Sequence, residues 1–195
     1  MRTLIFFILA VCVAAAPLEA REIVSFGPQE TYMLGSIPYT VLGQYRAHFN
    51  AFKGRIILDE KSAKVQSVYL EIKANSIASN CPWCDKMARS RRLLNTMRYP
   101  RIIFKSQAIT RVGDVYQVQG ILEMHGIKRT MSFPFEAMDI TGPTGRRWID
   151  LRGRWSINRK AFNIWWSRLL DRGGVVVGDY FTVSWAIRIP VVERH

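Results

Sequence analysis

The sequence is short of acidic residues, cysteine and histidine, and each shortage narrows the classes of protein to which it can belong. It holds 15 acidic residues against 28 Lys and Arg, a formal net charge of +13. None of the three histidines, His48, His125 and His195, lies at a spacing typical of metal ligands, so we expect no metal site and no catalytic histidine. No Gly-rich loop precedes a helix, and no Ser, His and Asp stand in a recognisable nucleophile context. We therefore expect a protein that is not an enzyme.

Long apolar runs are also missing, except at the N-terminus. After Arg2 the stretch from Thr3 to Ala16 is almost wholly apolar, and Leu18-Glu19-Ala20 ends on a small residue. The run is too short to span a bilayer comfortably, and no stop-transfer pattern follows, so it predicts a cleaved secretory signal peptide over residues 1–20. A buried N-terminal helix is one alternative. A lipoprotein anchor at Cys12 is another, because Leu9-Ala10-Val11-Cys12 is a degenerate lipidation box.

If the protein is exported, its net positive charge predicts different binding partners. Removal of residues 1–20 leaves the net charge unchanged, because that segment loses one basic and one acidic residue, Arg2 and Glu19. In an intracellular protein such a charge would first indicate nucleic acid. In an exported protein it fits anionic lipid head groups or the bacterial envelope, with a generally basic surface as the plain alternative. We expect a periplasmic protein of one domain, residues 21–195, with no nucleic-acid partner.

The mature sequence consists largely of stretches in which apolar and polar residues alternate, as in β-strands. A period of two places one set of side chains on one face of a sheet. Turn residues such as Val112-Gly113-Asp114, His125-Gly126 and Thr141–Gly145 separate the stretches. About eight strands at hairpin spacing predict a barrel or a sandwich, and the lack of strand–helix alternation argues against a parallel sheet. The expected strands cover residues 45–52, 54–58, 68–73, 101–105, 117–124, 131–136, 151–157 and 181–189.

One segment breaks the alternation. Asp85–Met97 mixes apolar and basic residues and is followed by Tyr99-Pro100, which predicts one short amphipathic helix between strands. Just ahead of it lie Cys81 and Cys84, the only cysteines after residue 20, and an oxidising compartment favours a disulfide between them. A C-x-x-C pair before a helix is also typical of disulfide oxidoreductases, although the surrounding βαβ context is missing. A thiol-disulfide or quinone-linked redox protein using this pair is therefore the alternative function.

Six sequence blocks, in order, carry a family resemblance. The third includes Tyr99-Pro100 and continues as Y-P-x-I-x-F-x-S, and the fourth ends on His125-Gly126. Together the blocks resemble the YceI-like family of bacterial periplasmic, polyisoprenoid-binding proteins. The Cys81–Cys84 pair departs from the family, which usually has a short polar stretch ending in an acid there. The blocks are Phe49–Asp59, Ser67–Ile77, Leu93–Ser106, Val118–Gly126, Asn158–Phe162 and Val177–Phe181.

The resemblance implies an all-β, eight-stranded antiparallel lipocalin-like barrel with one short inserted α-helix. It also implies an apolar lumen that holds a long-chain isoprenoid or similar amphiphilic lipid, of polyprenyl or quinone type, and no other cofactor. Burial of each CH₂ contributes about 0.8 kcal/mol, so a long tail can bind through apolar area alone. The alternative is that the inward side chains only fill a core. The candidate lumen residues are Phe49, Val68, Leu70, Phe104, Leu122, Met124, Phe133, Phe135, Trp155, Phe181, Val183 and Trp185.

A stretch of basic and aromatic residues near the C-terminus predicts contact with an anionic membrane surface. It runs from Arg159 to Leu170 and includes Trp165-Trp166. Trp favours the membrane interface and Arg favours anionic head groups, so this stretch suits a loop at the mouth of the lumen. The alternative is a loop that packs against the barrel.

Overall fold

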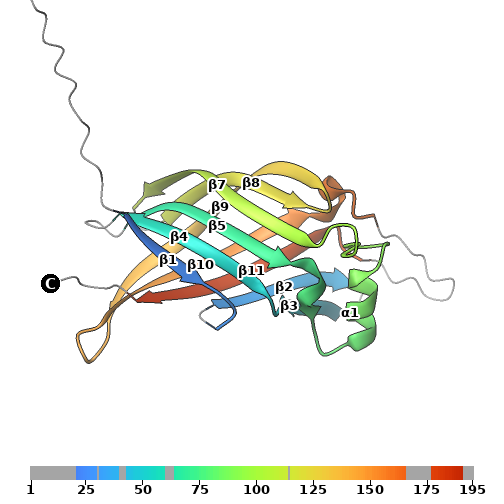
Figure 1. The fold of residues 1–195 in the computed structure, drawn as a ribbon, viewed down its shortest axis with the longest axis horizontal. Helices are drawn as coiled ribbons and strands as arrows, with labels where there is room; N and C mark the ends of the chain where they lie inside the picture. The colour runs from blue at the N-terminus through green and yellow to red at the C-terminus, as the bar shows by residue number, and fades with distance from the viewer. Residues whose placement is uncertain are drawn as a thin grey trace, which may run out of the picture.

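The computed structural model describes residues 21–29, 31–39, 43–59, 64–113, 115–165 and 177–190. The predicted signal peptide, with Cys12, lies outside these residues. Within them the chain forms one curled antiparallel sheet with a single α-helix, α1 (Pro82–Arg89), at one end (Figure 1). The strands are β1 (Arg21–Phe26), β2 (Thr31–Tyr39), β3 (Gly43–Phe49), β4 (Phe52–Asp59), β5 (Val65–Lys73), β6 (Ile77–Ala78), β7 (Arg101–Val112), β8 (Val115–Met124), β9 (Ile127–Thr141), β10 (Arg147–Asn158) and β11 (Tyr180–Pro190).

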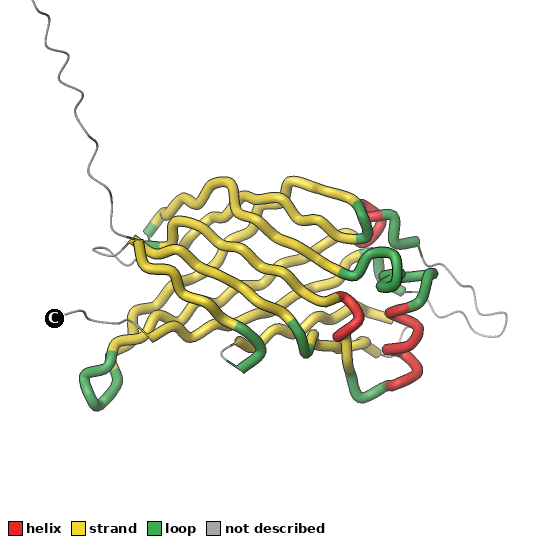
Figure 2. The backbone as a smooth tube through the Cα atoms, in the orientation of Figure 1, coloured by secondary structure: helices red, strands yellow, loops and turns green. Residues whose placement is uncertain are grey.

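The sheet has eleven strands in the order β1-β4-β5-β7-β8-β9-β10-β11-β2-β3-β6. It curls into a half-barrel (Figure 2). Within the described part of the chain, β1 and β6 are the two edges of the sheet. The predicted count of eight strands was therefore wrong. The three additional strands are β1, β2 and β6. β2 contains Gly35 and Pro38 and does not alternate cleanly, and β6 has two residues, too few to show a period.

The burial of side chains in the strands follows the alternation seen in the sequence. In β8 every second residue from Tyr116 to Met124 is buried, and the residues between them are more exposed. The β8–β9 hairpin closes at His125 and Gly126, which have φ values of 52° and 75°. Two consecutive positive φ values match the twist of the flanking strands, so this pair sets the register in which Met124 lies opposite Ile127.

Two inward-facing glycines leave room for aromatic rings that lie against the sheet. A Cβ atom on Gly54 would lie within 1.9 Å of the Phe26 ring, and one on Gly153 within 2.5 Å of the Trp185 ring. Such distances are far below van der Waals contact, so only glycine fits beneath these rings. The interior of the curled sheet therefore holds aromatic rings among its aliphatic side chains.

The helix is shorter than predicted and begins earlier. Cys81 is the N-cap, and Pro82 occupies the first turn, where a missing N–H costs nothing. Asp85 lies in the first turn, and Lys86 and Arg89 in the last, as the helix dipole favours. The helix ends at Arg89 because Ser90 has an extended backbone, and the Ser90 hydroxyl satisfies the Met87 carbonyl oxygen at 2.7 Å. None of the helices in the described ranges is long and apolar enough to cross a membrane.

Candidate ligand cavity

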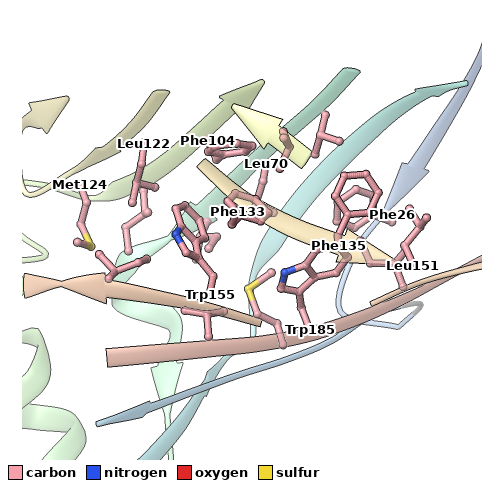
Figure 3. A pocket seen from close by; sticks show the side chains of 18 of the residues that line it. Phe26, Leu70, Phe104, Leu122, Met124, Phe133, Phe135, Leu151, Trp155 and Trp185 are labelled. Carbon is pink, nitrogen blue, oxygen red and sulfur yellow. The ribbon is translucent and has the colours of Figure 1, made fainter. Parts of the chain in front are cut away.

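An apolar cavity of about 110 Å³ lies inside the curled sheet (Figure 3). Its walls come from the inward faces of most of the strands, including β4, β5, β7, β8, β9, β10 and β11. Every predicted lumen residue except Phe49 lines it: Val68, Leu70, Phe104, Leu122, Met124, Phe133, Phe135, Trp155, Phe181, Val183 and Trp185. The strand alternation thus placed these side chains on the correct face, and their role in ligand binding stays a prediction.

Stacked aromatic rings narrow this first cavity. The Phe133 and Trp155 ring centroids are 4.3 Å apart, and the Phe104 ring meets Trp155 edge-on at 5.6 Å. Figure 3 shows these rings and Trp185 projecting into the same space. Ring contacts of this kind favour fixed side-chain positions, and these rings take up part of the space inside the sheet.

A second apolar cavity, of about 350 Å³, lies between the sheet and α1. Phe49, the remaining predicted lumen residue, lines this cavity and not the first. Three residues, Ile102, Met124 and Phe181, line both cavities. Because the cavities share these walls, they adjoin: one lies against α1 and the other lies in the interior of the sheet.

A buried carboxylate fixes α1 as a wall of the second cavity. Asp85 accepts hydrogen bonds from the Ser79 hydroxyl at 2.6 Å, the Ser79 amide at 3.0 Å and the Tyr45 hydroxyl at 2.7 Å. Burial by itself would raise the pKa of the Asp85 carboxyl, but the hydrogen bonds from Ser79 and Tyr45 outweigh burial and hold its pKa below the usual value. Burial and the bond to Asp85 raise the pKa of Tyr45. The cluster joins α1 to β3 and to the segment after β6.

A buried arginine fixes the opposite side of the same cavity. Arg159 begins the 3₁₀ helix η2 (Arg159–Phe162) and lines the second cavity. Its guanidinium donates to the carbonyl oxygens of Gly178, Ile164 and Val177 at 2.9, 2.7 and 3.2 Å, and to Asp179 at 3.3 Å. Since its donors are used within the protein, Arg159 holds the segment before β11 in place and is not available to a lipid head group.

Comparison with known proteins identifies the family. A family model described as the YceI-like domain matches residues 26–189. The chain belongs to the YceI-like family. A UPF0312 protein of Pectobacterium atrosepticum is 29% identical over 117 residues, which cover 60% of this chain and 61% of the relative. A UPF0312 protein of Yersinia pestis is 29% identical over 120 residues, with the same coverage. The match thus spans about three fifths of the length of these curated relatives.

Solved structures share the fold. BcnA of Burkholderia cenocepacia superposes with a TM-score of 0.70 at 20% identity, covering 82% of this chain and 96% of that one. A YceI protein of Campylobacter jejuni gives 0.61 at 15% identity, covering 79% and 88%. A polyisoprenoid-binding domain from Saccharophagus degradans gives 0.63 at 11% identity, covering 88% and 100%. At these identities the likeness establishes the all-β YceI-like fold.

Two of the sequence blocks that resembled the YceI-like family meet in space. Asn158–Phe162 and Val177–Phe181 are joined by the Arg159 guanidinium and by an ion pair of 2.6 Å between Lys160 and Asp179. His125, from a third block, contacts the same place: its Nδ1 lies 3.0 Å from the Phe162 carbonyl oxygen. Because only a donor can pair with a carbonyl oxygen, Nδ1 carries the proton, and this contact ties the β8–β9 turn to η2.

The predicted disulfide is present in this YceI-like chain. Cys81 and Cys84 are joined, with their Cα atoms 5.2 Å apart. The Cys84 amide donates to Cys81 Sγ at 3.3 Å, so the pair also caps the N-terminus of α1. Cys84 and its neighbour Trp83 line the second cavity. Among the described residues no cluster of three or more His, Cys, Asp and Glu side chains could hold a metal ion.

Several cavity residues were missed at the sequence level. Ile56, Ile72, Val118 and Leu151 line the first cavity and already lie within the predicted strands, so counting every residue of the inward faces would have found them. Tyr45, Ala47 and Phe49 alternate along β3 and all line the second cavity. The contributions of α1 carried no such signal, because its short apolar stripe is also typical of a helix that packs on a core. The missed residues on and near α1 are Ile77, Trp83, Cys84, Met87, Ala88, Leu93 and Leu94.

The predicted membrane-contact stretch is described as far as Trp165, and residues 166–170 lie outside the structure's described ranges. Arg159, Phe162 and Ile164 are buried, which agrees with the alternative of a loop packed against the barrel. Trp165 is exposed, and the Lys160 ammonium lies 5.8 Å from its ring centroid.

Proposed function

We propose that the protein is a periplasmic carrier for a long-chain isoprenoid or a similar amphiphilic lipid, which it holds in the two adjoining cavities. The observation that supports the proposal is that Ile102, Met124 and Phe181 line both cavities, so the two apolar spaces adjoin. Adjoining apolar spaces suit a flexible hydrocarbon tail, and each buried CH₂ contributes about 0.8 kcal/mol.

The relatives support the chemical class of the ligand. One structural neighbour of the same fold is a polyisoprenoid-binding domain. A tail of polyprenyl or quinone type would lie along the aromatic walls, with its apolar surface against Phe104, Phe133 and Trp155. The proposal gives the protein no catalytic step, no other cofactor and no nucleic-acid partner, and it places the protein in the periplasm after removal of residues 1–20.

The direct test is mass spectrometry of the intact protein, purified from its native host without detergent. We expect one apolar lipid bound to each chain. A matched pair of variants locates it. Ala47→Phe puts a ring into the second cavity and should abolish loading, whereas Ala108→Phe, on an exposed position of β7, should leave it unchanged. An empty wild-type protein, or equal loading of both variants, would contradict the proposal.

A redox protein is the second candidate. The observation in its favour is that the Cys84 amide donates to Cys81 Sγ at the N-terminus of α1, an arrangement that stabilises a thiolate once the disulfide is reduced. The double variant Cys81→Ser/Cys84→Ser separates the two functions: a carrier keeps its lipid, and an oxidoreductase loses its activity.

A further inference from the structure

The second cavity lies at the end of the molecule that carries α1. Figures 1 and 2 show α1, the turns that follow it and η2 together at this end, while the β7–β8 hairpin lies at the opposite one. Trp83 lines the second cavity and is nevertheless 67% exposed. Trp83 therefore forms a wall between the second cavity and solvent, and this thin wall beside α1 is where we place the entrance of the ligand.

Large apolar side chains are exposed on the segments that follow α1 and η2 at this end of the molecule. Met97, in the turns after α1, is 92% exposed, and Trp165, after η2, is 63% exposed. Tryptophan side chains are typical of the boundary between water and a bilayer, where the ring is buried and the indole N–H stays hydrated. At the opposite end the exposed apolar side chains of the β7–β8 hairpin are the smaller Val112 and Val115.

Uncompensated positive charge surrounds the same side chains. Lys86, Arg91, Arg92 and Arg98 are exposed, and none of them forms an ion pair with a described residue. The one acid between residues 79 and 99 is Asp85, whose carboxylate is buried and bonded to Ser79 and Tyr45. The surface beside the entrance is therefore positively charged, and the apolar side chains Met97 and Trp165 are exposed on it.

We propose that this entry face, formed by Trp83, Lys86, Arg91, Arg92 and Met97, docks on an anionic lipid bilayer. The inference rests on the proposed carrier function, since a lipid of low solubility must enter and leave through a membrane. Arg and Lys contact the anionic head groups, while Trp83 and Met97 insert among the upper acyl carbons. The entrance of the second cavity then faces the bilayer, and the tail passes between them without crossing water.

The test is flotation of the full chain with two kinds of vesicle, phosphatidylcholine alone and an equimolar mixture of phosphatidylcholine and phosphatidylglycerol. We expect binding to the anionic vesicles only. Arg91→Ser/Arg92→Ser should weaken it by about 30-fold, because each cation near an anionic surface contributes roughly a fivefold gain in affinity. Trp83→Ser/Met97→Ser should weaken binding to a similar degree.

Two control variants match these changes elsewhere on the surface. Lys64→Ser/Arg154→Ser removes the same charge from other exposed positions, and Val112→Ser/Val115→Ser removes apolar surface from the opposite end. Both should bind vesicles as the wild type does. Equal losses in the controls, equal binding to neutral vesicles, or no vesicle binding by the wild type would overturn the proposal. Capture of the wild type by polyglutamate but not by anionic vesicles would overturn it in favour of an acidic protein partner.

Intact-protein mass spectrometry of the same variants keeps this inference separate from the carrier function. If the wild-type protein holds lipid but does not bind anionic vesicles, the carrier function stands and the docking proposal is wrong. Wild-type protein that holds no lipid contradicts the carrier function itself, whatever its behaviour with vesicles.

Discussion

The two cavities adjoin, but they are built by different means. The first, of about 110 Å³, is walled by strands whose side chains alternate, and its apolar rings pack on one another. The second, of about 350 Å³, is walled partly by a short helix and a loop that buried polar groups hold in place. Regular strand pairing therefore creates the narrow part of the site, and a few specific polar contacts create the wide part. Mutations in these two regions should have correspondingly different effects.

The largest effect is expected at Arg159. Arg159→Met leaves the carbonyl oxygens of Gly178 and Ile164 without their buried donor, and separates η2 from the segment before β11. Loss of one partner from a buried charged network costs about 3 kcal/mol, so the free energy of unfolding should fall by about that amount. Urea denaturation followed by circular dichroism measures the change. Arg154→Met, at an exposed position of β10, is the control and should be nearly neutral. Equal stabilities of the two variants would disprove the role of Arg159.

A smaller effect that depends on pH is expected at Asp85. Near neutral pH, Asp85→Asn should lower the free energy of unfolding by about 1–3 kcal/mol, because the amide replaces a charged acceptor of three hydrogen bonds. The folded pKa of Asp85 lies below its unfolded value of about 3.9, so the stabilisation is complete above that pH. It is lost as the pH falls through the folded pKa.

The stabilities of wild type and Asp85→Asn should therefore converge on acidification. Urea denaturation at a series of pH values between neutrality and the acid limit measures this convergence. Glu136→Gln, at an exposed position of β9, should show no such gap at any pH. A constant difference between wild type and Asp85→Asn over the whole range would show that Asp85 acts by its shape alone.

The smallest effect is expected at the disulfide. It closes a loop of only four residues, so Cys81→Ser/Cys84→Ser should lower the free energy of unfolding by about 2 kcal/mol at most. Lipid loading, measured by intact-protein mass spectrometry, should stay unchanged, since Asp85 still joins α1 to the sheet. Loss of loading, or loss of a reductase activity that the wild type shows, would favour the redox alternative.

The sequence predicted the first cavity far better than the second, for a physical reason. Residues two apart in a strand lie on the same face of the sheet, so the shared face of Val68 and Leu70, or of Phe133 and Phe135, can be predicted from a short stretch of sequence. The second cavity depends on contacts between distant residues, such as Tyr45 with Asp85 and Arg159 with Val177, which no local period records. For the same reason the two-residue β6 and the irregular β2 were missed, which made the predicted strand count too low.

The most direct test of a single continuous site is the affinity of isoprenoid lipids of increasing tail length for wild type and for Val183→Phe. Val183 lines only the first cavity, so its replacement shortens the space beyond the second. Each added isoprene unit buries more apolar surface until the space is full. Affinity for the wild type should therefore keep rising at tail lengths where affinity for Val183→Phe has already levelled off. Affinities that level off at the same length in both proteins, or that ignore tail length, would contradict a ligand that occupies both cavities.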